Sequence, residues 1–159
     1  MKNSTVEVTP EGNIIVSGLT IMSGYVADEE NTRKVLKDGK IYGSDLGYVD
    51  DEGLIHLKGR QGDVINVGGF KVDPSEVENA AASHDSVKDC ICIAGTHPVI
   101  GTVLKLLVVL ADGASLDKRS LALHLKSKLE PHKIPTYYEA VDSIQRTYNG
   151  KLDRKFYKK

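Results

Sequence analysis

The segment of residues 59–78 gathers glycines, charged residues and a helix start in a short stretch of the chain. Gly68 and Gly69 stand side by side, and the backbone there can approach a narrow ligand closely because no side chain is in the way. Asp73 and Pro74 then provide a helix cap and a first helical residue. This combination is typical of a mobile catalytic element.

Three segments resemble, in the same order, the motifs of the adenylate-forming enzymes: acyl-CoA synthetases, luciferases and peptide-synthetase adenylation domains. They are residues 42–53, residues 59–78 and residues 149–155. One such segment alone is a weak signal, whereas three in the family's order are a strong one. The resemblance implies an enzyme that joins a carboxylate to the α-phosphate of ATP, releases pyrophosphate, and passes the acyl group from AMP to a thiol.

The resemblance implies that Lys151 is the catalytic lysine. A carboxylate and a phosphate are both anions, so a cation placed between them lowers the barrier to their reaction. Gly150 lets the lysine reach outward, and a terminal helix predicted over residues 152–157 would fix the backbone after it. The alternative is a solvated lysine in a basic tail with Arg154 and Lys155. The hinge-like segment in the same chain favours catalysis.

Two further residues are implied to bind the nucleotide. Asp45 matches the acidic residue that holds the ribose hydroxyls, and a carboxylate can accept two hydrogen bonds from a vicinal diol. Residues 43–44 are Gly-Ser where the family usually has Thr/Ser-Gly, so Asp45 could also be an ordinary turn residue. Arg60 matches an arginine near the hinge that bridges ribose and phosphate oxygens, with an ion pair to Asp63 or Glu52 as its alternative.

The resemblance also implies a moving hinge and a channel for the thiol. Gly62 stands where many relatives have Asp or Lys, and glycine can absorb large changes in φ and ψ. Gly68, Gly69 and Phe70 match the loop that approaches the pantetheine arm, although the two glycines would also form a hairpin turn. Lys71 follows, either near a CoA or acyl phosphate or as a surface lysine. Gln145 precedes Arg-Thr where the family usually has proline.

The elements that must position these residues change in kind near Arg60. Before it, β-structure predominates: the patterns predict a strand over residues 13–18, a capped helix over residues 28–36 and a β-hairpin around the acidic turn at residues 50–53. After it, strands alternate with helices. The predicted elements are a helix over residues 74–83, strands over residues 87–94 and 103–111, a helix capped by Ser115 and carrying Leu121, Leu125 and Leu129, and a strand over residues 137–141. The apolar strand over residues 103–111 is predicted to be central and covered on both faces.

Composition excludes several classes of protein. With 21 Lys and Arg against 22 Asp and Glu, a net charge of −1 produces no field that would attract nucleic acid or an acidic membrane. No apolar run approaches the roughly 20 residues of a membrane span, and the first residues do not resemble a signal peptide, so the sequence predicts a cytoplasmic protein. Cys90 and Cys92 alternate within an apolar strand and are predicted to be reduced core residues. The five His are scattered without metal spacing, so no metal site is predicted.

The predicted fold class is α+β, a small lid with a central β-sheet flanked by helices, preceded by strands from the end of a larger β-rich subdomain. Residues 1–59 are assigned to the end of the large AMP-binding domain, residues 60–63 to the hinge, and residues 64–159 to the mobile lid. In the family, the large N-terminal domain supplies the phosphate loop, the adenine site and the acid pocket. We therefore expect this chain to be inactive without such a partner. ATP, CoA and a carboxylic acid are the implied substrates, and Mg²⁺ is expected with ATP without a ligand assigned here.

Two other interpretations remain open. The chain could be a free-standing binding module that uses the lid fold to dock a partner N-terminal domain or an acyl-carrier protein, and an exposed apolar edge at residues 14–16 would support this. It could instead be a regulatory α+β ligand-binding domain, which leaves the motif around Lys151 unexplained. Residues 133–138 and the tail are similar to acyl-CoA ligases, which favours CoA over a carrier-protein thiol. The specificity for the acid stays open.

Overall fold

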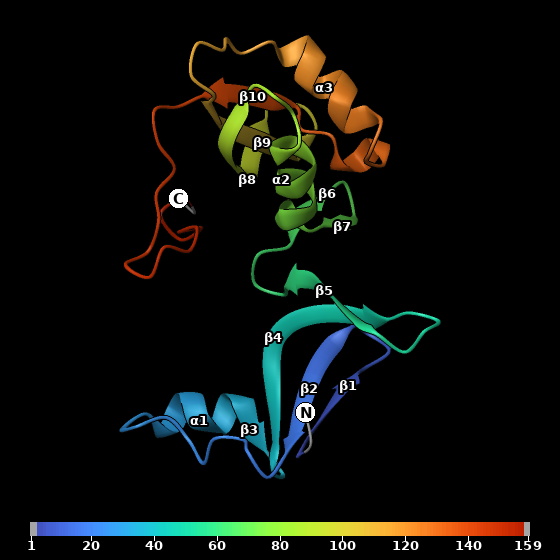
Figure 1. Ribbon diagram of the computed structural model, residues 1–159, viewed down its shortest axis with the longest axis vertical. Helices are drawn as coiled ribbons and strands as arrows, with labels where there is room; N and C mark the ends of the chain where they lie inside the picture. The colour runs from blue at the N-terminus through green and yellow to red at the C-terminus, as the bar shows by residue number, and fades with distance from the viewer. Residues whose placement is uncertain (1–2, 158–159) are drawn as a thin grey trace. The chain divides into compact units, whose positions relative to one another are not determined.

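The computed structural model describes residues 3–157, which fall into two compact units, Met1–Gly62 and Asp63–Lys159 (Figure 1). The division lies inside residues 60–63, the segment predicted to be a hinge. Movement at this segment stays a prediction. In the described part of the chain, no helix has the length and apolar character needed to cross a bilayer.

The first unit is a five-stranded antiparallel sheet with one short helix. Its elements are β1 (Ser4–Val8), β2 (Asn13–Gly18), α1 (Glu29–Val35), β3 (Leu36–Lys37), β4 (Lys40–Val49) and β5 (Ile55–Arg60). The strand order is β1-β2-β4-β3, and β5 also pairs with β4. The predicted strand, helix and hairpin are therefore present, and Asp28 caps α1 by accepting a hydrogen bond from the backbone N of Asn31.

Strand β4 is long and pairs with three strands: β3 at Lys40 and Ile41, β2 between Lys40 and Leu46, and β5 from Asp45 to Val49. The register with β5 shifts between Leu46 and Gly47. A Cβ at Gly47 would lie 2.5 Å from the backbone O of His56, so only glycine allows the strands to approach so closely there. The bulge thus lies between Asp45, in the middle of β4, and the hairpin tip.

The second unit is a three-stranded sheet with two helices and a small hairpin. Its elements are β6 (Ile65–Val67), β7 (Phe70–Val72), α2 (Pro74–Ala82), β8 (Val87–His97), β9 (Gly101–Leu110), α3 (Lys118–Lys126), the 3₁₀ helix η1 (Pro131–Lys133) and β10 (Tyr137–Ala140). Strand β9 is central, antiparallel to β8 and parallel to β10. The two predicted long strands extend further than expected, meeting in a hairpin at residues 98–100.

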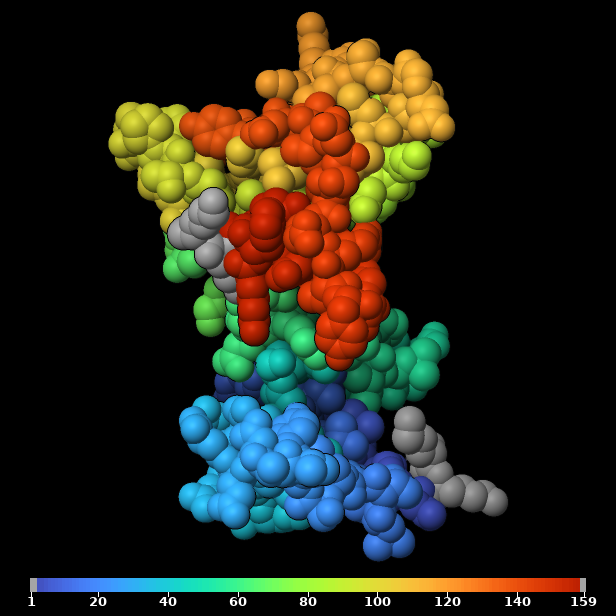
Figure 2. Space-filling view, turned by 90° about the vertical axis from the view of Figure 1, so that its left-hand side faces the viewer, coloured from blue at the N-terminus to red at the C-terminus, as the bar shows by residue number. Residues whose placement is uncertain are grey.

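Both faces of this sheet are covered, as predicted for the central strand. Successive side chains of β8 and β9 point to opposite faces, and two separate clusters form. On one face, α2 and α3 pack against the strands through Val77, Ala81, Leu121, Leu125, Cys90, Cys92, Leu104, Leu106 and Val108. On the other face, Ile91 and Leu107 contact Ile144 of the C-terminal tail, with Leu152 and Tyr157 packed beside them. Figure 2 shows this tail, in red, spread over its side of the unit.

Two predicted details of the second unit are wrong. The cap of α3 is Asp117, whose Oδ1 accepts from the backbone N of Arg119 and Ser120, and not Ser115. Residues 152–157 form a β-bridge residue and a turn in place of a terminal helix. Leu152 and Tyr157 instead pack against the cluster on this face of the sheet. Cys90 and Cys92 are free and buried, which confirms the prediction of reduced core residues.

Candidate functional site

Asp45 and Arg60 are brought together by the pairing of β4 with β5. They are direct partners in the register, and Arg60 Nε lies 2.8 Å from Asp45 Oδ1. Both side chains are about half exposed. An acceptor suited to a diol and a planar donor suited to phosphate oxygens are therefore adjacent on one surface. Sequence reasoning proposed both residues but missed this pair, because the register of a bulged hairpin is not readable from its ends.

The segment at the unit boundary is a turn over residues 61–63. It follows directly on the β4–β5 pairing, since the backbone N of Gln61 donates to the O of Ser44 at 2.8 Å. A Cβ at Gly62 would meet nothing within 4 Å, and its φ is not in the left-handed region. This conformation therefore does not require glycine at position 62, so any requirement would come from another conformation.

The glycine pair forms the tight turn between β6 and β7. Gly68 and Gly69 have φ of +57° and +93°, and Val67 pairs with Phe70 across the turn. A two-residue turn with positive φ at both positions is the type that matches the twist of a hairpin. Asn66 Oδ1 accepts a hydrogen bond from the backbone N of Gly69 at 3.0 Å. The hairpin that the sequence allowed is thus present, and it leaves the turn bare of side chains.

Beside the turn, Phe70 stacks on His132 with ring centroids 4.5 Å apart and planes 18° from parallel. Phe70 remains 56% exposed, so the stack lies at the surface. Lys71 is also exposed and pairs in register with Asn66. Phe70 belongs to the hairpin and His132 to η1, so the stack joins two segments that are far apart in the sequence.

Lys151 lies at the end of a hydrogen-bonded loop. The backbone N of Thr147 donates to the O of Lys151 at 2.8 Å, and the N of Gly150 donates to the O of Thr147 at 2.9 Å. Gly150 has a φ of +80°, which glycine adopts at no steric cost. The Lys151 side chain is exposed. The ion pairs around this loop belong to Arg146 and Arg154, and none within residues 3–157 includes Lys151.

The main residue that sequence reasoning missed is Arg154, which it named only as a neighbour of Lys151 in the alternative of a basic tail. Its side chain is only 13% exposed, and its two terminal nitrogens each lie 2.7 Å from one carboxylate oxygen of Glu78. Its Nε also lies 3.3 Å from Asp63 Oδ2. Burial would lower the pKa of Arg154, but the hydrogen bonds and charges of Glu78, with the charge of Asp63, raise the pKa above its usual value. The guanidinium is therefore a buried and permanently charged anchor.

The sequence of α2 indicates that a buried carboxylate, Glu78, needs a cationic partner. The buried residues of that helix are Pro74, Val77, Glu78 and Ala81, spaced as one apolar stripe. A carboxylate in such a stripe needs a partner, because an unpaired buried charge is costly. The sequence does not show which of its cations supplies this partner, 76 residues further along.

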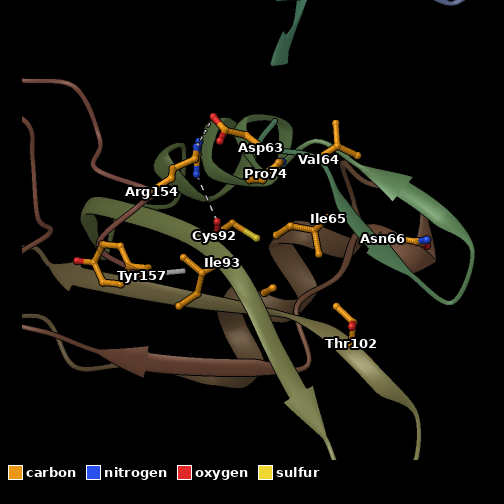
Figure 3. A pocket seen from close by; sticks show the side chains of 11 residues that line it. Asp63, Val64, Ile65, Asn66, Pro74, Cys92, Ile93, Thr102, Arg154 and Tyr157 are labelled. Carbon is orange, nitrogen blue, oxygen red and sulfur yellow. Dashed lines mark hydrogen bonds and ion pairs between the residues drawn. The ribbon is translucent and has the colours of Figure 1, made fainter. Parts of the chain in front are cut away.

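A cavity of about 350 Å³ lies next to Arg154 (Figure 3). Its lining is mostly apolar, with Val64, Ile65, Pro74, Ile93 and Tyr157 among the side chains. The charged groups in the lining are Asp63 and Arg154, which are paired with each other. Apolar surroundings of this kind strengthen the ion pair, because fewer water molecules screen it.

The cysteines and histidines do not add a reactive centre. Burial, followed by the charges of Glu78 and Asp89, raises the pKa of Cys90 to about 12, and burial also raises the pKa of Cys92. Both thiols therefore stay protonated and unreactive near neutral pH. Within residues 3–157, no three His, Cys, Asp or Glu side chains are grouped so that they could bind a metal ion.

The predicted site residues thus fall into local groups. Asp45 and Arg60 form a pair in the first unit. In the second unit, the glycine turn is fixed by Asn66 and the Phe70 stack, and the Lys151 loop is fixed by hydrogen bonds of its own. Chemically, the first group can bind a polyhydroxylated anion, and the Lys151 loop presents a cation to solvent.

Comparison with known proteins gives one consistent family. Residues 76–151 match the AMP-binding enzyme C-terminal domain. The long-chain-fatty-acid–CoA ligase of Bacillus subtilis is 35% identical over 144 residues, which are 91% of this chain and 26% of that protein. The predicted α+β fold is confirmed by solved structures that cover nearly the whole chain.

One of these structures is the o-succinylbenzoate CoA synthetase of Bacillus subtilis in complex with its acyl-adenylate intermediate. It has a TM-score of 0.89 at 26% identity, over 99% of this chain and 34% of that one. Another is an amide bond synthetase from Marinactinospora thermotolerans. It has a TM-score of 0.87 at 30% identity, over 98% of this chain and 34% of that one. The chain therefore spans about a quarter to a third of the length of these relatives.

Proposed function

Because residues 76–151 belong to the family of AMP-binding enzyme C-terminal domains, and acyl-CoA ligases are similar to most of the chain, we propose that it serves as the C-terminal part of an ATP-dependent acid–thiol ligase. In the first half-reaction, the acid's carboxylate attacks the α-phosphate of ATP and pyrophosphate leaves. In the second, a thiol attacks the acyl carbonyl and AMP leaves. The N-terminal AMP-binding part of such a ligase supplies most of the substrate contacts.

The exposed Lys151 carries this proposal. Its loop is hydrogen-bonded internally, while its ammonium group belongs to none of the ion pairs of residues 3–157. An ammonium carried by an ordered backbone can stabilise the charge that develops where carboxylate and phosphate meet. A lysine of a merely solvated basic tail would not need an ordered loop.

The remaining predicted residues take roles in the same proposal. Asp45 accepts hydrogen bonds from the ribose hydroxyls, and the neighbouring Arg60 contacts ribose or phosphate oxygens. The turn at Gly68 and Gly69 approaches the pantetheine arm after the lid rotates about Gly62, with Phe70 and Lys71 beside the channel. Mg²⁺ accompanies ATP, with no ligand assigned in this chain.

CoA is the proposed thiol, and the acid is left open. The two relatives from Bacillus subtilis are named as CoA ligases for a long-chain fatty acid and for o-succinylbenzoate, whereas the Marinactinospora relative is named an amide bond synthetase. The similar fold therefore accompanies different acids and acceptors. A cytoplasmic location is part of the same proposal.

The experiment is a chimera in which this chain replaces the matching segment of the Bacillus subtilis long-chain-fatty-acid–CoA ligase. We expect ATP–pyrophosphate exchange and acyl-CoA formation from the chimera and neither from the chain alone, because most of the binding energy comes from the other domain. Acyl-CoA formation by the chain alone, or submicromolar binding of ATP to it, would contradict the proposal. A Lys151→Ala chimera is the matched control.

A docking module is the second candidate, favoured by apolar side chains that the first unit exposes. Leu19, Val26 and Leu57 are exposed by 90%, 98% and 75%. Against it, Ile14 and Ile15 are buried within the sheet, so the exposed apolar edge at residues 14–16 that would support a docking module is absent. Titration of the chain with a separate AMP-binding domain, and with an acyl-carrier protein, distinguishes the two functions. A module would bind either one tightly without supporting exchange.

A further inference from the structure

The tail that carries Lys151 is attached to the second unit by an arginine on each side of the loop. Arg146 lies before it and donates to Asp89 Oδ2 of β8 at 2.6 Å and to the O of Gly150 at 3.0 Å. Arg154 lies after it and is the more deeply buried of the two. Between them, Leu152 packs on the sheet and bridges to Arg146.

The contacts of Arg154 reach three different parts of the unit. Its terminal nitrogens contact both carboxylate oxygens of Glu78 on α2, and Nη1 also donates to the O of Cys92 on β8 at 3.3 Å. Its Nε faces Asp63, the first residue of the unit (Figure 3). Glu78 in turn accepts from the backbone N of Cys92 at 2.7 Å. Helix, strand, tail and the start of the unit therefore meet at one guanidinium.

Arg154 is unsuited to binding a substrate anion, since its donors already face two carboxylates and a carbonyl. Its planar fork matches the Glu78 carboxylate in a bidentate pair, which fixes direction as well as distance. Such a pair restrains the backbone only three residues from Lys151. The exposed lysine thus stands on a loop whose far side cannot shift without breaking a buried ion pair.

We propose that Arg154, held by Glu78, is a positioning residue for Lys151: it fixes the lysine loop to α2 and β8 so that the ammonium group enters the adenylation site in one geometry. This inference rests on the proposed function. Misplacement of a reacting group by about 1 Å can lower a rate by about 10²-fold, so a loosened loop should affect the step that uses Lys151.

The test uses Arg154→Lys and Glu78→Gln in the active chimera, with Lys105→Met as matched control. Lys105 also forms an ion pair in the second unit, 2.6 Å from Glu139, but on β9 and β10. We expect kcat of adenylation to fall about 10-fold or more in both test variants, with KM for ATP nearly unchanged. Thioester formation from supplied acyl-adenylate should be retained, and Lys105→Met should leave both steps unchanged.

A second measurement uses this chain alone. Hydrogen exchange at residues 147–152 should become faster in Arg154→Lys, while exchange in β8 and β9 stays slow, because the loop loosens without global unfolding. Unchanged adenylation, equal loss of both half-reactions in a folded variant, or unchanged loop exchange would overturn the inference. If Lys151→Ala does not lower adenylation, the proposed function itself fails. If only the Lys151 variant lowers adenylation, the positioning role fails alone.

Discussion

At the scale of single residues, Lys151 differs from its basic neighbours in what surrounds it. Arg146 and Arg154 are bound to carboxylates of the second unit, whereas Lys151 is exposed and belongs to none of the ion pairs of residues 3–157. Burial of Arg154 also changes how the motif is understood. Among these cations, Arg146 and Arg154 are paired with carboxylates, whereas Lys151 and Lys155 are exposed.

We expect Lys151→Ala in a complete ligase to reduce adenylation by about 10²-fold or more, as for loss of one preorganised charge. Thioester formation from supplied acyl-adenylate should persist, because the bond between the α- and β-phosphates of ATP, whose cleavage Lys151 is proposed to assist, is already broken in that substrate. The two half-reactions are measured separately by pyrophosphate exchange and by acyl-CoA release. Lys155→Ala, an exposed lysine of the same tail, should change neither. Near-normal adenylation in the Lys151 variant would remove it from catalysis.

Two buried acids predict a loss of stability at high pH. Burial raises the pKa of Cys90 from 9.0, and that of Tyr138 from 10.0, in each case to about 12. The unfolded chain therefore loses these protons at lower pH than the folded chain. The free energy of unfolding should be unaffected below about pH 9 and fall as pH rises from there toward 12.

Denaturant titrations from about pH 8 to about pH 11 measure this dependence. Tyr138→Phe should weaken this pH dependence and lower the free energy of unfolding near neutral pH only slightly. The reason is that the Tyr138 hydroxyl is buried without a hydrogen-bond partner among the described residues. Cys90→Ala should weaken the pH dependence further. If both variants keep the full pH dependence, these groups are not its cause.

At the scale of secondary-structure elements, caps and turns decide where each element ends. Asp73 Oδ1 accepts from the N of Ser75 to begin α2, and Asp117 does the same for α3. The β4–β5 pairing runs up to the segment at Gly62 and ends there. These boundaries place the glycine turn and the segment predicted to be a hinge at the ends of strands.

The cap of α3 is tested by comparing two nearby residues. Asp117→Ala should lower the free energy of unfolding of the second unit by about 1 kcal/mol, because two backbone N–H groups lose their acceptor. Ser115→Ala should change it by less than about 0.5 kcal/mol, since Ser115 is exposed and does not cap the helix. Thermal unfolding of both variants gives the comparison. Equal effects would contradict the assignment of the cap.

The hinge is tested by two substitutions at Gly62. Alanine should be tolerated, because its Cβ would meet nothing within 4 Å and the φ is ordinary. Proline should slow the thioester step by about tenfold or more relative to adenylation, because it fixes φ and restricts rotation of the lid. Both half-reactions are measured in the ligase carrying each variant. Equal slowing of both steps by proline would point to misfolding rather than to a hinge.

At the scale of the whole molecule, burial is divided unequally between the two units. In residues 3–62, only Ile14 and Ile15 are buried apolar side chains. The second unit, by contrast, has one apolar cluster on each face of its sheet. A unit with so small a core gains little from burial against its loss of chain entropy. The first unit should therefore be the less stable of the two.

We expect the first unit to open before the second when denaturant is added to this chain. Hydrogen exchange in β2 and β4 should become fast while β8 and β9 remain protected. Cys90 and Cys92 should react with a thiol reagent only when the second unit unfolds, because both are buried there. Simultaneous loss of protection in the two units would show that they unfold as one.

The sequence by itself determined the local elements and the residues of the motif. Apolar runs of strand length predicted the long strands, turn and cap chemistry predicted the hairpins and the capped helix α2, and the order of motifs indicated the family. These signals are readable because they depend on neighbours within a few positions. The glycine turn at Gly68 and Gly69 is an example, since glycine adopts positive φ at no steric cost.

Only the tertiary structure decided which distant residues meet. It paired Arg154 with Glu78 across 76 positions, packed Leu152 and Tyr157 on the sheet where a helix was expected, and joined Asp45 to Arg60 across a bulged hairpin. Local preferences of the tail are weak, and apolar burial and a buried charge pair outweighed them. A buried carboxylate demands a partner, but packing alone selects which cation reaches it.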